Sequence, residues 1–346
     1  MKTSSLMRSC KRLGAFAVSC CSVRSVLAIP VGLMLGLLPL TSGPASSGVL
    51  PLPYLPRSAH QAYGYGLAQT RLAQNVLGQQ WLAAAERALL EPERIVTPFE
   101  AASSFAASAP SARSYAFAVR DGQRVRVEAQ PQTNEQLELF VDLFRATAKG
   151  LEQVASGLPV PPTGEAALRP IEVEVFEPAE YVLRVQPALA RIDRESDNTG
   201  YAVAVRVLTS PLLAFPVEGF DTRAIQSGFG AERDGGARAH RGVDIFAPRG
   251  ATAVAATDAW VVRVETTRVG GNVVWLQPLF GNMRLYYAHL DRQYVERGQF
   301  VLAGEPIGAV GNTGNAISTP PHLHFGVYVR KPGVRGGARD PYGFLR

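Results

Sequence analysis

Four of the five histidines in this chain of 346 residues lie in three short segments of its last third. The segments are HRGVD from His240 to Asp244, YYAHL from Tyr286 to Leu290, and HLHF from His322 to Phe325. Neutral imidazoles and a carboxylate are the ligands that hold a zinc ion while leaving one coordination position open for water. If these side chains bind one ion, the fold must bring three separate segments to the same point.

The HLHF segment has the spacing of a strand. His322 and His324 are separated by one residue, so on a strand they share one face of the sheet. Leu323 and Phe325 would then point to the opposite face, into a core. This geometry allows one histidine to bind a metal while the other stands beside it.

The other two segments can supply further side chains to that point. His240 and Asp244 lie four residues apart around Gly242, and a loop that enters a strand can turn both toward one ion. In YYAHL, strict alternation predicts that Tyr287 and His289 share a face. Each spacing alone is common by chance, and a core histidine is then the more frequent explanation. Their combination favours a metal site.

The composition, with an apolar fraction of 47%, predicts a globular protein long enough for two or more domains. The formal net charge is +6, but residues 1–41 contain five of the 35 lysines and arginines and no acidic residue. The rest of the chain is therefore almost neutral. This argues against a nucleic-acid partner, since phosphate binding needs a basic surface.

The N-terminus has the order of a secretion signal. A basic stretch precedes an apolar run from Ser25 to Leu40 and a small-residue segment from Thr41 to Ser47. We favour cleavage near Ala45, which makes residues 1–45 a signal peptide; retention as an N-terminal membrane anchor is the alternative. Both interpretations predict an extracytoplasmic protein, in the periplasm, the cell envelope or the medium.

The cysteines support this compartment. Cys10, Cys20 and Cys21 all lie in the leader, so a cleaved product has no thiol and no disulfide. The candidate metal site contains no cysteine, which suits an oxidising environment. Acylation of Cys20 is a weaker alternative, because the apolar stretch before it is short.

Residues 46–62 are rich in Pro, Ser and Gly and predict a linker, in which His60 would be an ordinary surface histidine. A helical segment is expected over residues 63–112. Apolar residues recur at every fourth position within Leu67–Leu90, a run that Pro92 ends. The repeating positions are Leu77, Trp81, Ala85 and Leu89. This stripe predicts a helix packed on a neighbouring domain.

Residues 113–209 predict a β-rich, sandwich-like accessory domain. Asp121 and Gly122 separate two alternating runs and predict a two-residue hairpin turn, because both residue types tolerate positive φ. The predicted strands are Tyr115–Arg120, Gln123–Glu128, Ile171–Phe176, Tyr181–Val185 and Tyr201–Val207. This region contains no histidine and no chemical motif.

Residues 216–346 combine many glycines with short apolar runs, as a compact antiparallel β domain does. The predicted strands are Val261–Val264, Val273–Leu276, Arg284–Tyr287 and Leu323–Val329. The fold class is therefore mainly β, with this C-terminal antiparallel domain preceded by a helix and the sandwich-like domain.

The motifs and their order resemble the LytM and lysostaphin-like zinc metallopeptidases, the M23 family of peptidoglycan endopeptidases. The resemblance covers roughly residues 215–345. It rests on HRGVD, the stretch Ala247–Val262, YYAHL, the glycine-rich run Gly298–Gly314, HLHFGVY and the closing segment Asp340–Leu345.

The resemblance implies that one Zn²⁺ is bound by His240, Asp244 and His324, and that His289 and His322 form the catalytic, non-ligand pair. The metal would lower the pKa of its bound water, one imidazole would accept the proton, and the other would stabilise the oxyanion. Which of the two histidines is the base stays open.

Some relatives use a tyrosine shortly before the first ligand to stabilise the oxyanion. This chain has no tyrosine between Tyr201 and His240, so the role is vacant or belongs to another donor, such as Arg233 or Arg238. Asn312 and Thr313 are further residues that either line the cleft or serve only their turn.

The sequence thus predicts a zinc metalloendopeptidase that cleaves peptide cross-links of bacterial peptidoglycan. A non-catalytic cell-wall-binding or amidase-activating protein of the same fold is the alternative, but such members lack one or more ligands that this chain has. A metallopeptidase that acts on proteins or on another bacterium's wall is a third interpretation. The bond cleaved, the oligomeric state and the role of the accessory domain, as a spacer, a wall-binding module or a cover for the site, stay open.

Overall fold

The structure is a computed structural model that describes residues 58–70, 72–106, 109–132, 138–157, 169–189, 200–279, 281–331 and 334–345. The expected leader, its cysteines and most of the expected linker lie outside these residues. Within the described part of the chain, no helix is long and apolar enough to cross a membrane.

The predicted helical run from Leu67 to Leu90 forms two helices, α1 (Ala59–Gln69) and α2 (Val76–Leu90). The break follows from a cap: the side-chain oxygen of Asn75 accepts a hydrogen bond from the amide of Gly78 at 2.7 Å and starts a new helix. The short 3-10 turns of the chain are Leu72–Gln74, Thr222–Ala224, Asp234–Gly236, Gly314–Ala316 and Pro341–Gly343.

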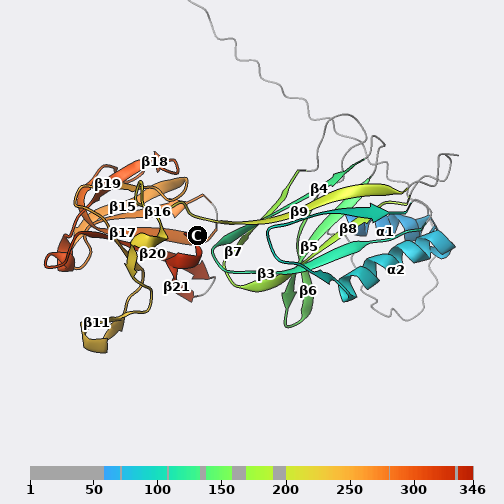
Figure 1. The fold of residues 1–346 in the computed structure, drawn as a ribbon, viewed down its shortest axis with the longest axis horizontal. Helices are drawn as coiled ribbons and strands as arrows, with labels where there is room; N and C mark the ends of the chain where they lie inside the picture. Colours follow the sequence, from blue (N-terminus) through green and yellow to red (C-terminus); the bar gives the residue numbers. More distant parts are fainter. Residues whose placement is uncertain are drawn as a thin grey trace, which may run out of the picture. The chain divides into compact units, whose positions relative to one another are not determined.

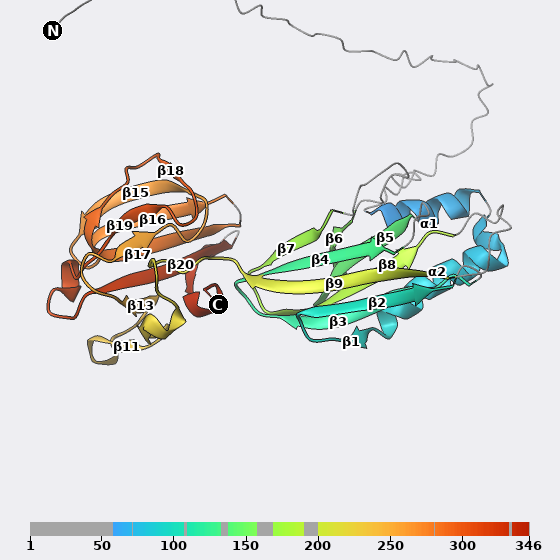
Figure 2. The ribbon, with the colours of Figure 1, turned by 45° about the horizontal axis from the view of Figure 1, so that its top comes forward.

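Strands β1 to β9 form two sheets that share one core (Figures 1 and 2). The five-stranded sheet has the order β1-β3-β8-β5-β6, and the four-stranded sheet has the order β2-β9-β4-β7. Their bounds are β1 Glu93–Arg94, β2 Phe99–Phe105, β3 Arg113–Val119, β4 Gln123–Pro131, β5 Leu139–Thr147, β6 Gly150–Ser156, β7 Ile171–Val175, β8 Ala179–Pro187 and β9 Tyr201–Pro211. Buried Val125, Leu143 and Val205 belong to the shared core, which makes this region sandwich-like.

The apolar stripe of α2 covers the outer face of the five-stranded sheet. The ring of Trp81 packs 5.9 Å from that of Phe140 on β5, and Leu89 packs on Ala116, Phe144 and Val182. This cover explains why the first six residues of β5 are all buried, since core and helix enclose both faces of the strand.

The expectation of a helical segment over residues 63–112 is wrong in its second half, which contains β1 and β2. Strand β2, Phe99–Phe105, is rich in alanine and serine and pairs along its whole length with β9. Its exposure alternates with period two, so tertiary pairing overrides a composition that favours helix.

The predicted hairpin at Asp121 and Gly122 is also wrong, because β3 and β4 belong to different sheets. The turn itself is present, and Gly122 has a φ of 75°. Its amide donates to the carbonyl of Val175 and its carbonyl accepts from the amide of Leu212, so its bonds lead to β7 and to the end of β9, the two neighbours of β4. The turn could be predicted because it depends on two adjacent residues. The partners of β3 and β4 could not, because they are distant in the sequence.

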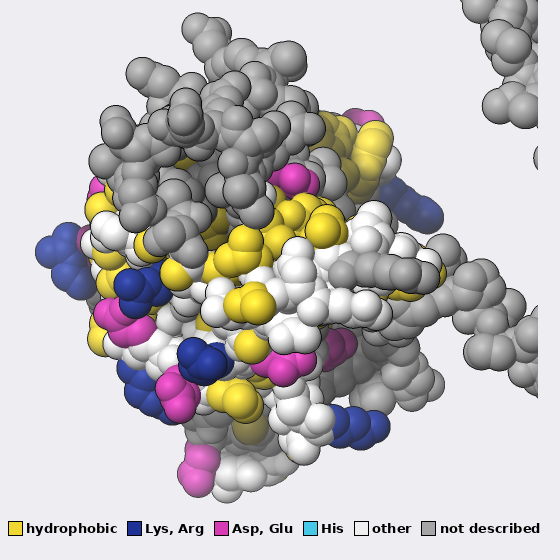
Figure 3. Space-filling view, turned by 90° about the vertical axis from the view of Figure 1, so that its right-hand side faces the viewer, with side chains coloured by type: hydrophobic (Ala, Val, Ile, Leu, Met, Phe, Trp, Pro, Cys, Tyr) yellow, Lys and Arg dark blue, Asp and Glu magenta, His cyan; other side chains and the backbone are white. Residues whose placement is uncertain are grey.

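His60 is not a surface residue of a linker. It lies on α1 with 7% exposure, and its Nε2 donates to the side-chain oxygen of Gln186 at 2.6 Å. Its ring stacks on Trp81 with 4.6 Å between centroids. Figure 3 views the molecule from the side of the helices, and the coloured part of this face shows acidic and basic side chains interspersed but no histidine.

The C-terminal region forms a ten-stranded sheet whose main path is β10-β13-β20-β17-β16-β15-β18. Strand β14 pairs with β19, β19 also pairs with β17, and β21 pairs with β20, while β11 and β12 form a separate ribbon. The bounds are β10 Ile225–Ser227, β11 Glu232–Arg233, β12 Arg238–Ala239, β13 Val243–Phe246, β14 Thr252–Val254, β15 Ala259–Thr267, β16 Gly271–Pro278, β17 Met283–Gln293, β18 Phe300–Val301, β19 Pro306–Val310, β20 His322–Lys331 and β21 Val334–Arg339. All four strands predicted for this region lie within β15, β16, β17 and β20, and the antiparallel β prediction is confirmed.

Candidate functional site

Strand pairing brings two of the predicted ligands together. Strand β13 runs antiparallel to β20 with Asp244 directly opposite His324, so both side chains rise from the same face of the sheet. His240 lies in the turn between β12 and β13 and is 4% exposed. On β20, Leu323 and Phe325 are fully buried in the core, as the predicted alternation requires.

Three potential ligand atoms converge on one point. The Nε2 atom of His240 lies 3.0 Å from Oδ1 of Asp244, and Nδ1 of His324 lies 2.9 Å from both of these atoms. A tetrahedral zinc ion separates its ligand atoms by roughly 3.3 Å, so small side-chain shifts would admit the ion. The donor set, two imidazole nitrogens and one carboxylate oxygen, is of the type that binds zinc.

Neighbouring groups fix the orientation of these ligands. The Nδ1 atom of His240 donates to the carbonyl of Gly228 at 2.8 Å, which leaves the lone pair of Nε2 for the site. Arg233 donates to Oδ2 of Asp244 at 2.6 Å and to the hydroxyl of Ser227 at 2.7 Å. The carboxylate is thereby held by one oxygen, and the other oxygen faces the two histidines.

The protonation states in the site suit a cation. Burial by itself would raise the pKa of Asp244, but the close contacts with the imidazoles of His240 and His324 outweigh it and lower the pKa below its ordinary value. Burial lowers the pKa of His324, against the opposing effect of Asp244. At neutral pH the site therefore holds an ionised carboxylate beside a neutral imidazole, the forms in which both groups bind metals.

Gly242 permits the close approach of the HRGVD loop to β20. A Cβ atom at this position would lie 2.4 Å from the carbonyl oxygen of Phe325 and 2.8 Å from Nε2 of His324. Both distances are too short for any side chain. The glycine is therefore required by the packing of the loop on a ligand, a role that the sequence pattern did not reveal.

His289 reaches the site through an irregularity in β17. Its φ is 64°, and the pairing of β17 with β16 shifts register between Tyr287 and Leu290, as at a β-bulge. The expectation that Tyr287 and His289 share a face is therefore wrong. Tyr287 is fully buried, and its hydroxyl accepts from the amide of Ala256, whereas His289 lies beside His322 with 5.1 Å between ring centroids.

His289 and His322 present the same nitrogen to the site. Their Nδ1 atoms donate to the carbonyls of Thr313, at 2.8 Å, and Pro320, at 2.9 Å. A carbonyl can only accept, so Nδ1 carries the proton and Nε2 keeps a lone pair. Nε2 of His322 lies 4.0 Å from Oδ1 of Asp244. Burial lowers the pKa of His289 to about 4, which keeps it neutral and able to accept a proton at neutral pH.

Of the other residues that the sequence suggested, some contact the site and others lie outside it. Arg233 contacts the site through Asp244, whereas Arg238 is exposed on β12. Asn312 bonds to Arg249 and to carbonyls of its own turn, and it serves to hold the turn. Thr313 contributes its carbonyl to His289.

Tyr286 lies against the proposed metal ligands, a place that no spacing in the sequence predicted for it. Its ring meets that of His324 edge-on with 5.8 Å between centroids, and burial raises its pKa to about 12, so its hydroxyl stays protonated. The signal was its place in β17: the residue lies opposite Gly326 of β20, two positions after His324, and therefore on the face of that ligand.

Comparison with known proteins finds matches to the C-terminal region. Residues 238–340 match peptidase family M23. The chain is 35% identical over 134 residues to the peptidoglycan DD-endopeptidase ShyC of Vibrio cholerae, a match that covers 37% of this chain and 28% of the relative. It is 36% identical over 142 residues to the L-Ala--D-Glu endopeptidase of Bacillus subtilis, covering 38% of this chain and 43% of the relative.

A third relative is the glycyl-glycine endopeptidase ALE-1 of Staphylococcus capitis, which is 38% identical over 108 residues and covers 31% of this chain and 29% of the relative. The chain thus spans less than half the length of each of these relatives. The region that matches the family, residues 238–340, contains the four histidines and the aspartate of the site.

Proposed function

We propose that the protein is a zinc-dependent endopeptidase that cleaves peptide cross-links of bacterial peptidoglycan, and that residues 238–340, which match peptidase family M23, form its catalytic domain. One observation carries the proposal. Three lone pairs, from His240, Asp244 and His324, converge on one point, and two further imidazoles beside it keep Nε2 unprotonated. The three would hold the metal, and His289 and His322 would transfer protons.

Zinc bound by these three residues would supply Lewis acidity that activates water and polarises the carbonyl of the scissile peptide bond. The chain's own residues perform the proton transfers. Nε2 of His289 or of His322 accepts the proton of the attacking water, because each ring already carries its other proton on Nδ1. That proton then passes from Nε2 to the nitrogen of the leaving amine, while the second histidine, after taking up a proton from solvent, donates from Nε2 to the developing oxyanion.

Arg233 supports this chemistry indirectly. Its Nη2 atom donates to Oδ2 of Asp244 and to the hydroxyl of Ser227, so it holds the carboxylate. We assign it the positioning of the carboxylate. The tyrosine role that the sequence left vacant is open to Tyr286, whose ring lies against His324.

The substrate class rests on the relatives. Their names specify three different bonds, DD, L-Ala--D-Glu and glycyl-glycine, and each relative is 35% to 38% identical to this chain over the matched residues. Each of these names specifies hydrolysis of a peptide bond, which supports the same type of reaction for this chain, with the choice of bond set by residues outside the proposed metal site. Action on peptidoglycan also supports an extracytoplasmic location, consistent with a secretion signal at the N-terminus.

The test is digestion of purified peptidoglycan by the protein, with and without a metal chelator, followed by identification of the released muropeptides. We expect about one zinc per chain and release that stops when zinc is removed. A matched His324→Ala protein is the control for non-enzymatic release. A zinc-loaded protein that binds peptidoglycan without cutting it would instead support the non-catalytic alternative.

A further inference from the structure

The face of the sheet that carries the metal ligands continues as a row of side chains away from them. Strand pairing places Gly326 opposite Tyr286, Tyr286 opposite Trp275, and Trp275 opposite Arg263. Residues paired in this way share one face, so the row lies on the face of His324, two residues further along β20. With about 4.8 Å between strands, the row extends roughly 14 Å across the sheet.

This row leads into a hollow of about 700 Å³ on β15, β16 and β17. Trp275 forms part of its lining and is held in place by two neighbours, with 4.4 Å between its ring and that of Tyr286 and 5.3 Å to that of Tyr328. Tyr286 in turn contacts His324, so one aromatic ring separates the hollow from a proposed metal ligand.

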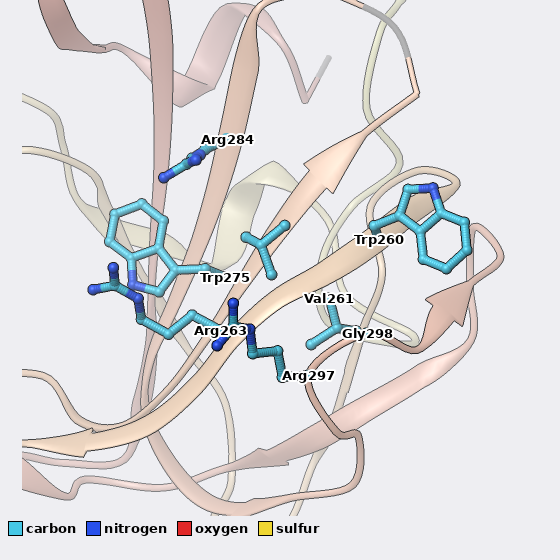
Figure 4. Close-up of a pocket in the computed structure, with 8 residues that line it drawn as sticks. Trp260, Val261, Arg263, Trp275, Arg284, Arg297 and Gly298 are labelled. Atoms are coloured by element: carbon cyan, nitrogen blue, oxygen red, sulfur yellow. The ribbon is translucent and has the colours of Figure 1, made fainter.

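Three arginines line the hollow. Figure 4 shows Arg263 and Arg284 near the indole ring of Trp275, while Arg297 extends toward them from the loop before β18. Arg263 lies 3.3 Å from Glu265, and Nε of Arg284 donates to the neutral side chain of Gln277 at 3.3 Å. Among the residues that the structure describes, neither Arg284 nor Arg297 has a carboxylate within ion-pair distance. The hollow therefore carries excess positive charge beside an aromatic surface.

We propose that this hollow is a substrate subsite that binds a carboxylate of the peptidoglycan stem peptide while the scissile bond lies at the metal centre. The inference rests on the proposed function. Guanidinium groups bind carboxylates through paired hydrogen bonds, and the indole surface packs on the aliphatic part of the same residue. A span of 10 to 14 Å places that carboxylate about three or four residues of extended chain from the scissile bond.

The test compares two synthetic cross-linked peptides that differ only in one group, a free carboxylate or its carboxamide, at that distance from the scissile bond. We expect the protein to cleave the acid with a kcat/KM about tenfold above that of the amide, mainly through KM. The preference should weaken at high salt, since the arginines are partly exposed. In the Arg263→Gln/Arg284→Gln double variant the acid-to-amide ratio should fall toward one.

Arg292→Gln is the matched control, because Arg292 lies on the same strand β17, is exposed and does not line the hollow. It should keep the preference for the acid. Equal cleavage of both peptides by the unmodified protein, or a double variant that retains the preference, would overturn the subsite while leaving the proposed function intact.

Failure of the proposed function has a different signature, in which neither peptide is cleaved. Calorimetric titration of the zinc-free protein with each peptide then still decides the subsite. Tighter binding of the acid that is lost in the double variant supports it, and equal affinity for the two peptides contradicts it.

Discussion

Two buried clusters in this protein contain histidine and aspartate, and they differ in where their lone pairs point. In the accessory region, Nε2 of His60 donates to Gln186, and Asp142 accepts from Arg184 at 2.6 Å and from Gln153 at 2.8 Å. Each acceptor has its own donor. With these acceptors satisfied, the cluster can serve the stability of the fold.

In the C-terminal region, Nε2 of His240, Oδ1 of Asp244 and Nδ1 of His324 all point to one small volume. These three atoms are mainly acceptors, so they lack the protons needed to hydrogen-bond to one another. A cation would satisfy all three at once. Burial of histidine with aspartate therefore does not by itself identify a metal site. Convergence of the lone pairs on one point does.

The largest effect is expected from removing one converging ligand. His324→Ala should reduce the zinc content from about one equivalent per chain to nearly none and reduce peptidoglycan cleavage to background, because two remaining ligands bind weakly. His60→Gln is the matched variant in the other cluster and should retain zinc. Elemental analysis and muropeptide release on the same samples provide the measurement. Full zinc occupancy in His324→Ala would remove this residue from the ligand set.

A second large effect separates proton transfer from metal binding. His289→Ala and His322→Ala should each keep zinc but lower turnover by about a hundredfold to ten-thousandfold, as loss of a general acid or base does. The double variant should lose less than the product of the two single losses, because both groups act on one transition state. Near-normal turnover in either single variant would refute its role, and loss of zinc would move the residue into the ligand shell.

The sequence predicted the β class and the strand alternation of the HLHF segment because both follow from local rules. Alternation placed Leu323 and Phe325 in the core, and the structure agrees. The rule failed for His289, since the left-handed φ of this residue, 64°, reverses the face to which its side chain points. No residue type in YYAHL predicts such a bulge, because the bulge arises from the pairing of β17 with its neighbouring strands.

Non-local pairing also explains the errors in the accessory region. The turn at Gly122 was recognised by its chemistry, but β4 pairs with β9, whose sequence lies far away. His60 was placed on the surface because the proline-rich stretch before it predicted a linker, whereas α1 begins at Ala59 and buries it against Trp81. Burial by a distant partner leaves no local signal.

Gly242→Ala tests how tightly the convergent cluster is built. The new methyl group would lie 2.8 Å from Nε2 of His324 and must displace either this ring or the paired strand. We expect a loss of about 1 to 3 kcal/mol in the free energy of unfolding, the usual cost of overpacking. Zinc affinity should fall by about tenfold, as when the orientation of a ligand is disturbed.

The control is Gly337→Ala on β21, where an added Cβ meets no atom within 4 Å. Thermal unfolding and competitive zinc titration of both variants give the two quantities. Unchanged zinc affinity in Gly242→Ala would show that the ligands tolerate displacement, and that the convergence is less strict than the geometry indicates.

The last effect concerns the His60 cluster and depends on pH. Burial, followed by the charge of Arg184, lowers the pKa of His60 from 6.5 to about 4 in the folded state. Above pH 6.5 His60 is neutral in both the folded and the unfolded protein, so its burial does not reduce the free energy of unfolding. As the pH falls from 6.5 toward 4, the unfolded chain takes up the proton first, so stability is lost over this window. We expect His60 to account for roughly 1 to 3 kcal/mol of that loss.

Urea unfolding at pH 7 and pH 4.5 measures how much unfolding free energy is lost on acidification. The difference in this loss between the unmodified protein and His60→Gln gives the contribution of His60. A chelator is present throughout, so that zinc release does not contribute. Glutamine can still donate to Gln186 but does not titrate. The variant should therefore lose less stability on acidification than the unmodified protein. Equal losses would mean that the pKa of His60 is the same in the folded and unfolded protein. His60 would then take up its proton in place beside Trp81, and burial in this cluster would not oppose its charge.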